Sequence, residues 1–483
     1  MWHKISDKQF LVFLVLLNII LKLCYIQTNE VGGDEPFSIF HAQLPISNII
    51  HILSKGNNPP LYEIFLHYWI QCFGISEIAV RMPSLIFSTA SAIFVFKIGI
   101  AFFPRYTAIC SALFFTLANY NINLAQEARV YAMFGLFTAA AMFFFLKIIM
   151  EKYEIKNYWW LLVFDTLLIY CHYFGFFIII IQILSIISIQ EILKKSFKQF
   201  LLFYIVLMVL YIPNIPTLWH QFFTSSSNGT WLGPPTGLVS LYDMLWRFSN
   251  APVTTVLSIL MLFFAILLFI YKNDYLLISP KYKILLLWFL FPFLFMFGIS
   301  FWIPMFLDRY LVFVSIAYYL LLGLTISFLQ NQFKYGYFFS ILLLISFLLT
   351  CTPHIQKHRN LTICLKDIQK LKNDQTILAV WPKDFIFTFL YQYDRALFQK
   401  YISNNFTDSL QSEMIHKNIY VIDDLSEAHL DSTKNLLILN AAPYLQDSRI
   451  SPINFLELDN FRAQNFEYND KLKLQYYENK RQL

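Results

Sequence analysis

The sequence has 483 residues, of which 58% are hydrophobic and only 14% are charged, and its formal net charge is +6 at pH 7. Aromatic residues account for 19% of the chain, including 52 Phe. This composition excludes a disordered chain, a coiled coil and a small disulfide-rich scaffold. It predicts a polytopic membrane protein that is surrounded mostly by lipid.

The charges are unevenly distributed along the chain. Residues 1–352 carry 20 Lys and Arg against 14 Asp and Glu, whereas residues 353–483 carry 16 of each. The excess of positive charge is therefore confined to the apolar part, where it indicates cytoplasmic loops that are rich in Lys and Arg. We expect a transmembrane domain over 1–352 and a small soluble domain over 353–483.

Apolar runs that could cross the hydrocarbon core of a bilayer recur through the first domain. They predict an all-α membrane fold with about eleven transmembrane helices, near 9–26, 78–99, 106–120, 128–149, 158–171, 173–190, 199–216, 252–271, 283–302, 309–329 and 336–352.

One further apolar run, Leu61 to Phe73, is only about 13 residues long and contains Glu63 and His67. If this run does not cross the membrane, the basic loops that follow it all lie on the cytoplasmic side, as the charge bias requires. We therefore expect an interfacial helix within a first outer loop over 27–77. The C-terminal domain is then extracytoplasmic.

The first outer loop opens with the sequence Val-Gly-Gly-Asp34-Glu35-Pro. A carboxylate beside the membrane could act as a general base on a hydroxyl group. The same residues also suit the start of a helix, with Asp34 as the cap and Pro36 in the first turn. Both interpretations remain open from these residues alone.

Three further motifs follow in order: Asn-Pro-Pro-Leu-Tyr at 58–62, Gly-x-x-Glu-x-x-x-Arg-x-Pro-Ser at 74–84, and Gln-Glu-Ala-Arg-Val-Tyr at 126–131. Together with the Asp-Glu pair, they resemble the bacterial membrane glycosyltransferases of the protein O-mannosyltransferase class (glycosyltransferase family 39). These are relatives of the enzymes that transfer aminoarabinose to lipid A. The resemblance continues more loosely through 231–235 and 308–310.

This resemblance implies a GT-C fold in the bacterial cytoplasmic membrane. It implies that a polyprenyl-phosphate-linked sugar is transferred to an acceptor hydroxyl on the non-cytoplasmic face. It also implies that Asp34 is the catalytic base, with Glu35 in a supporting role. The lipid A enzymes have Glu-Lys before the corresponding proline, whereas this chain has Asn58-Pro59, so another residue must contact the donor phosphate.

Arg129 and Arg309 are our candidates for that contact, because a guanidinium offers a planar fork to phosphate oxygens. The alternative for each is a side chain that reaches to the interface or pairs with a neighbouring acid, Glu127 or Asp308. Arg81 is a further candidate.

For Arg81 the alternative is an ion pair with Glu77, one helical turn earlier. A further set of residues from the motifs and the predicted outer face is expected to bind substrate: Tyr62, Glu127, Tyr131, His172, Tyr173 and Tyr310. In a chain with 29 Tyr, placement in the aromatic belt of the membrane interface is the competing explanation for any one tyrosine.

The sequence contains no HExxH motif and no paired metal ligands at helical spacing, and we predict neither a metal nor another cofactor. No Gly-rich phosphate loop follows a strand, which argues against a nucleotide-sugar donor. The expected partners are the polyprenyl-phosphate sugar, an acceptor protein, lipid or glycan, and membrane lipids, but no nucleic acid.

In the soluble domain, short apolar runs at 376–380, 418–422 and 436–440 and a final run at 471–478 predict strands. Helical stretches near 384–394 and 424–434 complete a small α/β domain.

Two other functions remain open from the sequence: a flippase or transporter of lipid-linked saccharides, and a noncatalytic subunit of a glycan assembly complex. Against a transporter, the sequence shows no internal repeat, and its acidic residues concentrate at one predicted membrane face.

Overall fold

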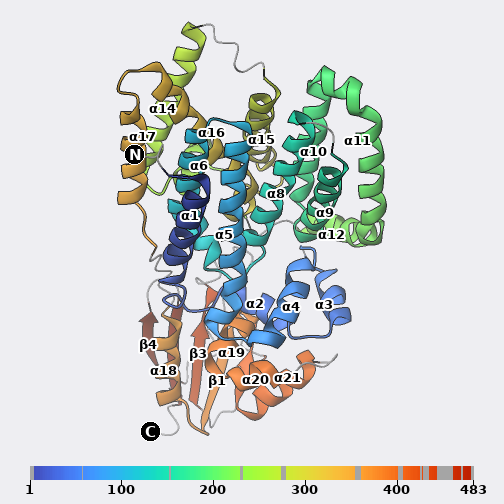
Figure 1. Ribbon diagram of the computed structural model, residues 1–483. Coiled ribbons are helices and arrows are strands. Elements are labelled where there is room, and N and C mark those ends of the chain that lie inside the picture. The colour runs from blue at the N-terminus through green and yellow to red at the C-terminus, as the bar shows by residue number, and fades with distance from the viewer. Residues whose placement is uncertain are drawn as a thin grey trace. The chain divides into compact units, whose positions relative to one another are not determined.

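The computed structural model describes residues 5–56, 58–151, 154–228, 232–272, 279–353, 360–400, 406–424, 427, 435–442, 461–468 and 472–479. Figure 1 shows the helices and strands among them. The chain divides into two compact units. The first, the helical unit, comprises Met1–Ile26, Ile52–Tyr62 and Arg81–Ile355; the second, the mixed unit, comprises Gln27–His51, Glu63–Val80 and Gln356–Leu483.

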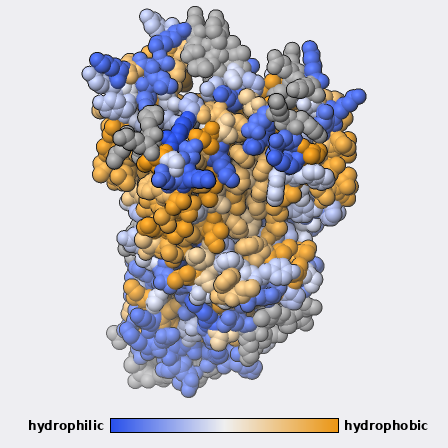
Figure 2. Space-filling model, viewed as in Figure 1, coloured by the Kyte–Doolittle hydropathy of each residue, from blue (hydrophilic) through white to orange (hydrophobic). Residues whose placement is uncertain are grey.

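The helical unit contains α1 (Asp7–Leu23), most of α5 (Glu77–Phe102), α6 (Arg105–Leu117), α7 (Asn119–Ala125), α8 (Tyr131–Met150), α9 (Ile155–Cys171), α10 (Gly175–Ser188), α11 (Gln190–Tyr211), the 3-10 turn η2 (Ile212–Asn214), α12 (Ile215–Asn228), α13 (Val239–Phe248), α14 (Pro252–Tyr271), α15 (Pro280–Ile299), η4 (Asp308–Leu311), α16 (Val312–Gln332) and α17 (Tyr337–Leu349). Hydrophobic residues cover much of the visible surface of these helices (Figure 2). Met208 on α11 is 74% exposed and Leu349 on α17 is 79% exposed. Such surfaces suit contact with lipid.

Each of the eleven predicted apolar runs contains a helix or a bent pair of helices. Among the described residues, six helices are long and apolar enough to cross a membrane. A seventh span results if Arg105–Leu117 and Asn119–Ala125, which are bent by 59° to each other, are counted as one. The helices α10 and α17 are apolar but shorter. The structure therefore supports a multi-pass membrane protein, whereas the expected number of eleven spans is not confirmed.

Helix α16 forms the centre of the helical unit. In the span Asp308–Gln332, 83% of the apolar window is buried, against 22% in Ser196–Gln221. Gly323 permits a close approach to α6, because a Cβ added there would lie 2.7 Å from the carbonyl oxygen of Thr107.

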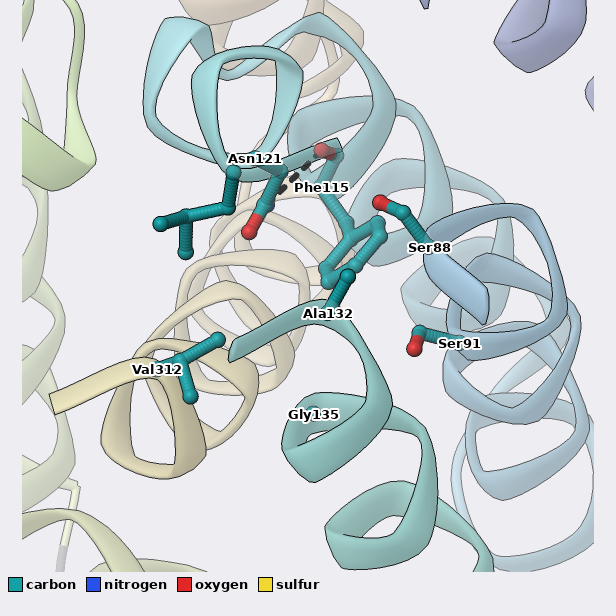
Figure 3. A pocket seen from close by; sticks show the side chains of 8 residues that line it. Ser88, Ser91, Phe115, Asn121, Ala132, Gly135 and Val312 are labelled. Atoms are coloured by element: carbon teal, nitrogen blue, oxygen red, sulfur yellow. Dashed lines mark hydrogen bonds between the residues drawn. The ribbon is translucent and has the colours of Figure 1, made fainter. Parts of the chain in front are cut away.

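A buried lysine joins α1 to α5. The ammonium of Lys22, which is 0% exposed, donates to Asn18 Oδ1 and to Ser88 Oγ on α5, the latter at 2.8 Å. Ser88 also lines a small cavity between α5, α6, α7, α8 and α16, into which Ser91 and Asn121 face (Figure 3). The amino group of Lys22 thus has its hydrogen-bond partners inside the helix packing.

The mixed unit is built around a five-stranded sheet with the order β2-β1-β3-β5-β4. The strands are β1 (Thr376–Trp381), β2 (Ile419–Val421), β3 (Asn435–Asn440), β4 (Phe461–Tyr468) and β5 (Leu472–Asn479). β1 pairs in parallel with β2 and β3, whereas β5 is antiparallel to both β3 and β4. All six residues of β1 are buried, as expected of a strand that is covered on both faces.

These strands agree with the predicted runs at 376–380, 418–422, 436–440 and 471–478. The sequence did not predict β4. The helices of this segment are α18 (Leu361–Leu371), the turn η5 (Lys383–Phe385), α19 (Ile386–Tyr393), α20 (Arg395–Lys400) and α21 (Phe406–His416). The helical stretch predicted near 424–434 lies almost entirely outside the described residues.

The mixed unit also includes most of the predicted first outer loop, with α2 (Glu35–His41), most of α3 (Ile46–Leu53) and most of α4 (Leu61–Phe73). The bounds of α4 coincide with the short apolar run, and its position at the membrane interface stays a prediction. Ser38 on α2 donates a hydrogen bond of 2.7 Å to Glu63 on α4. α2 packs against α19, and the ring of Phe40 lies 4.7 Å from that of Phe387.

Candidate active site

In the mixed unit, the two acids of the first loop have different surroundings. Asp34 is exposed and occupies the N-cap position of α2, but its side chain makes no capping hydrogen bond. Glu35 is 2% exposed and accepts a hydrogen bond of 3.4 Å from the backbone N–H of Gly32. The carboxylate of Glu35 therefore stabilises the turn, while that of Asp34 is accessible.

The turn before Asp34 depends on glycine. Gly33 has φ = +62°, a backbone conformation that residues with a Cβ adopt only at a cost. Pro36 in the first turn of α2 has the φ angle that a helix start needs. The sequence Gly-Gly-Asp-Glu-Pro therefore specifies a sharp turn followed directly by a helix.

In the helical unit, His172 lies in the turn between α9 and α10. Its Nδ1 accepts a hydrogen bond of 3.2 Å from the backbone N–H of Phe174, the N-cap residue of α10. Since Nδ1 is the acceptor, the proton of the neutral ring is on Nε2. Nε2 is buried and has no hydrogen-bond partner among the described residues.

Aromatic rings surround this histidine. Phe134 on α8 stacks on the imidazole at a centroid distance of 5.0 Å, and Phe174 lies 5.1 Å away. Tyr310 is at 5.8 Å and Tyr131 at 6.3 Å. The rings come from three separate stretches of chain and leave the imidazole 4% exposed.

Two arginines flank the same cluster. The guanidinium of Arg309 lies 5.8 Å from the ring centre of Tyr131 and 6.0 Å from that of Tyr310. Arg129, which is 8% exposed, lies two residues before the start of α8. Burial and the charges of these two arginines lower the pKa of His172 to about 3. The imidazole is therefore neutral at physiological pH and can only donate through Nε2.

Asp308 anchors the turn that carries Arg309. Its Oδ2 accepts a hydrogen bond of 2.9 Å from Arg247, and its Oδ1 accepts one of 2.7 Å from the backbone N–H of Arg309. The hydroxyl of Tyr120 donates to the carbonyl oxygen of Asp308 at 2.6 Å. Sequence reasoning missed this role of Arg247, because the partners are 61 residues apart.

Other predicted site residues have contacts elsewhere. Arg81 is 1% exposed and donates a hydrogen bond of 2.7 Å to the carbonyl oxygen of Ile26. The hydroxyl of Tyr173 donates to Gln221 on α12, whose amide donates at 2.6 Å to the carbonyl oxygen of Leu53. These hydrogen bonds stabilise the backbone at Ile26 and Leu53.

Two more predicted residues remain. Tyr62 is fully buried, and Glu127 is partly exposed, with its carbonyl oxygen accepting a hydrogen bond of 2.9 Å from the backbone N–H of Arg129.

The helical unit thus brings together five of the predicted residues, namely Arg129, Tyr131, His172, Arg309 and Tyr310. The sequence did not identify Phe134 and Phe174, although each lies within three residues of a predicted one. Among the described residues, no group of three or more His, Cys, Asp or Glu side chains is placed to hold a metal ion.

Fold and site together define a multi-pass membrane protein with a buried, cation-flanked cluster in its helical unit and an accessible acid in its mixed unit. Residues 57–219 match the model of the family described as dolichyl-phosphate-mannose-protein mannosyltransferase. This segment includes Arg129 and His172 but neither Asp34 nor Arg309. No curated protein sequence matches the chain.

Solved structures resemble the chain over nearly its whole length. ArnT from Cupriavidus metallidurans bound to undecaprenyl phosphate has a TM-score of 0.59 at 9% identity, over 98% of both chains. The apo form of the same protein gives 0.61 at 10% identity, over 96% of this chain and 97% of that one. The oligosaccharyltransferase from Archaeoglobus fulgidus, in complex with Zn and sulfate, gives 0.57 at 11% identity, over 97% of this chain and 73% of that one.

At these identities the likeness shows a shared fold. The family match is confined to residues 57–219, whereas the shared fold extends over nearly the whole chain.

Proposed function

We propose that the protein transfers a sugar from a polyprenyl-phosphate-linked donor to an acceptor hydroxyl on the non-cytoplasmic face of the bacterial cytoplasmic membrane. The observation that carries this proposal is the buried Nε2–H of His172, which has no hydrogen-bond partner among the described residues and lies in a cluster flanked by Arg129 and Arg309. A buried donor without a partner is costly, and a phosphate oxygen would satisfy it.

The chemistry of the cluster suits a phosphate that leaves with the lipid. Two guanidinium groups supply charge and planar donors, and the neutral imidazole adds a third donor without further positive charge. The surrounding aromatic rings exclude water, so these interactions are stronger than they would be in solvent. Because negative charge on the phosphate grows as the glycosidic bond breaks, the cluster would stabilise the transition state more than the bound donor.

Asp34 is the proposed general base. Its carboxylate takes the proton of the acceptor hydroxyl while that oxygen forms a bond to the anomeric carbon. The bond from the anomeric carbon to the phosphate oxygen breaks, its electron pair stays on the phosphate, and the polyprenyl phosphate leaves. Direct displacement inverts the anomeric centre. The exposure of Asp34 and its lack of a capping hydrogen bond favour this role over the helix-cap alternative.

The proteins of similar fold are consistent with such a donor. ArnT was solved with undecaprenyl phosphate. The archaeal oligosaccharyltransferase AglB from Archaeoglobus fulgidus was solved with an inhibitory peptide and a dolichol-phosphate. The remaining predicted residues, Tyr62, Glu127, Tyr131, Tyr173 and Tyr310, stay proposed substrate contacts, as does Arg81.

The decisive experiment is a transfer assay with the purified protein in detergent. Polyprenyl-phosphate sugars are supplied with candidate acceptors, and the release of polyprenyl phosphate is measured. We expect release that requires the acceptor and is strongly reduced in Asp34→Asn. A flippase would instead move the intact lipid across vesicle membranes without releasing sugar. A noncatalytic subunit would do neither.

A further inference from the structure

Within the mixed unit, one face of α19 holds the backbone that leads to Asp34. The hydroxyl of Thr388 donates a hydrogen bond of 3.3 Å to the carbonyl oxygen of Gly33. Four residues later, on the same helix face, the amide of Gln392 donates one of 2.9 Å to the carbonyl oxygen of Val31. Both bonds join segments more than 350 residues apart in sequence.

The backbone that leads to Asp34 is also held at Glu30, one residue before Val31. Both carboxylate oxygens of Glu30 accept hydrogen bonds from the start of α18, at 2.9 Å from the N–H of Leu361 and at 2.8 Å from that of Thr362. These are backbone groups that a helix leaves without partners in its first turn, and a carboxylate there is favoured by the helix dipole.

The chain that follows Asp34 is held by packing. The ring of Phe387, on α19, lies 5.9 Å from Phe37, 4.7 Å from Phe40 and 5.2 Å from His41, all on α2. Asp34 is therefore the exposed residue between two stretches that the C-terminal segment fixes.

From this arrangement we infer that the C-terminal segment positions the catalytic base, with Thr388 and Gln392 as positioning residues. This inference rests on the proposed function of Asp34. A loop that contains Gly32-Gly33 would otherwise be flexible. A base must lie within hydrogen-bond reach of the acceptor hydroxyl, and a misplacement of about 1 Å can cost about 10²-fold in rate.

The test is the double variant Thr388→Val/Gln392→Met, in which both donors are lost and side-chain size is nearly kept. We expect kcat to fall about 10-fold while KM for the donor and the binding of undecaprenyl phosphate change by less than about 2-fold, because donor binding does not use Asp34. Hydrogen exchange at the amides of residues 30–35 should rise. Thr388→Ser, which keeps the hydroxyl, should retain near-normal kcat.

Two controls separate positioning from a general loss of stability. Lys473→Met removes a hydrogen bond of 2.9 Å from β5 to Glu467 on β4, in the same segment but on neither α18 nor α19, and should leave kcat unchanged. In an Asp34→Asn background, the double variant should cause no further loss, because the residue being positioned no longer acts as a base.

The inference is overturned if the double variant keeps both normal kcat and normal exchange, or if it lowers the residual rate equally in the Asp34→Asn background. A wild-type protein that releases no polyprenyl phosphate from any sugar donor would instead refute the proposed function. The exchange measurement does not depend on activity, so it would still decide whether Thr388 and Gln392 hold the loop.

Discussion

The two acids at the start of the first loop show how one turn assigns different roles to neighbouring carboxylates. Glu35 is buried and bound to the backbone N–H of Gly32, whereas Asp34 is exposed and leaves the helix start uncapped. A buried, hydrogen-bonded carboxylate serves structure, and an accessible one can accept a proton.

We predict that Asp34→Asn lowers turnover by about 10²–10⁴-fold, the usual contribution of general acid–base catalysis. Asn has nearly the same size and caps a helix about as well as Asp, so folding and donor binding should persist. Steady-state kinetics together with undecaprenyl phosphate binding check this. Glu35→Gln is the matched control and should reduce turnover less. If Glu35→Gln abolishes transfer while Asp34→Asn retains it, the two assignments must be exchanged.

Two substitutions of His172 by amide residues test the roles of Nδ1 and Nε2 separately. His172→Asn can still accept from the N–H of Phe174 but has no group at the position of Nε2, whereas His172→Gln places an amide donor there. We predict that His172→Asn weakens undecaprenyl phosphate binding by about 10-fold or more, the usual value of a hydrogen bond to a charged group. His172→Gln should retain affinity to within about 3-fold. Equal affinities of the two variants would refute donation by Nε2.

At the scale of secondary structure, Gly323 decides how closely α6 and α16 pack. Replacing an exposed helix glycine with alanine usually stabilises a helix by about 0.5–1 kcal/mol. At Gly323 the added methyl would lie 2.7 Å from the carbonyl oxygen of Thr107 and 3.0 Å from the backbone nitrogen of Ser111. We therefore predict that Gly323→Ala lowers the melting temperature of the purified protein.

Gly298 on α15 is the control, because a Cβ there has no atom within 4 Å. Gly298→Ala should leave the melting temperature unchanged or raise it. A Gly323→Ala variant as stable as Gly298→Ala would mean that the helices can move apart at little cost.

The sequence predicted elements where one local signal dominates. The run at 376–380 is apolar and became the fully buried β1, and the apolar run Leu61–Phe73 became α4. It missed β4, with the sequence FRAQNFEY, because this edge strand has no β-branched residue and depends on its pairing with β5. The bend between α6 and α7 falls at Ala118, whose backbone is extended with ψ = 118°, and neither Gly nor Pro marks it in the sequence.

The site was predictable to a similar degree. A motif pointed to Arg129, and the predicted outer membrane face pointed to His172. The tautomer of His172, however, depends on the backbone N–H of Phe174, which no sequence pattern specifies. The hydrogen bonds from Thr388 and Gln392 to the Asp34 loop were equally invisible, because contacts across more than 350 residues leave no periodic signal in one sequence.

At the scale of the whole molecule, the charge asymmetry of the sequence predicts which membrane side each loop occupies. If α4 stays at the outer interface, the basic loops that follow lie in the cytoplasm, and the nearly neutral C-terminal segment lies outside. If α4 crosses the membrane, every later loop is inverted, and the positive loops face outward against the usual bias.

We predict that a cysteine at Ser76, after α4, and one at Ser412, on α21, react with a membrane-impermeant thiol reagent added to intact cells. A cysteine at Lys334, between α16 and α17, should react only after the membrane is opened. The experiment requires a background without the exposed native Cys24 and Cys72, and each variant must retain transfer activity. Labelling of Lys334→Cys from outside together with protection of Ser76→Cys would invert the topology. Arg129, His172 and Arg309, which follow α4, would then lie on the opposite side of the membrane from Asp34, which precedes it, and from the assumed acceptor.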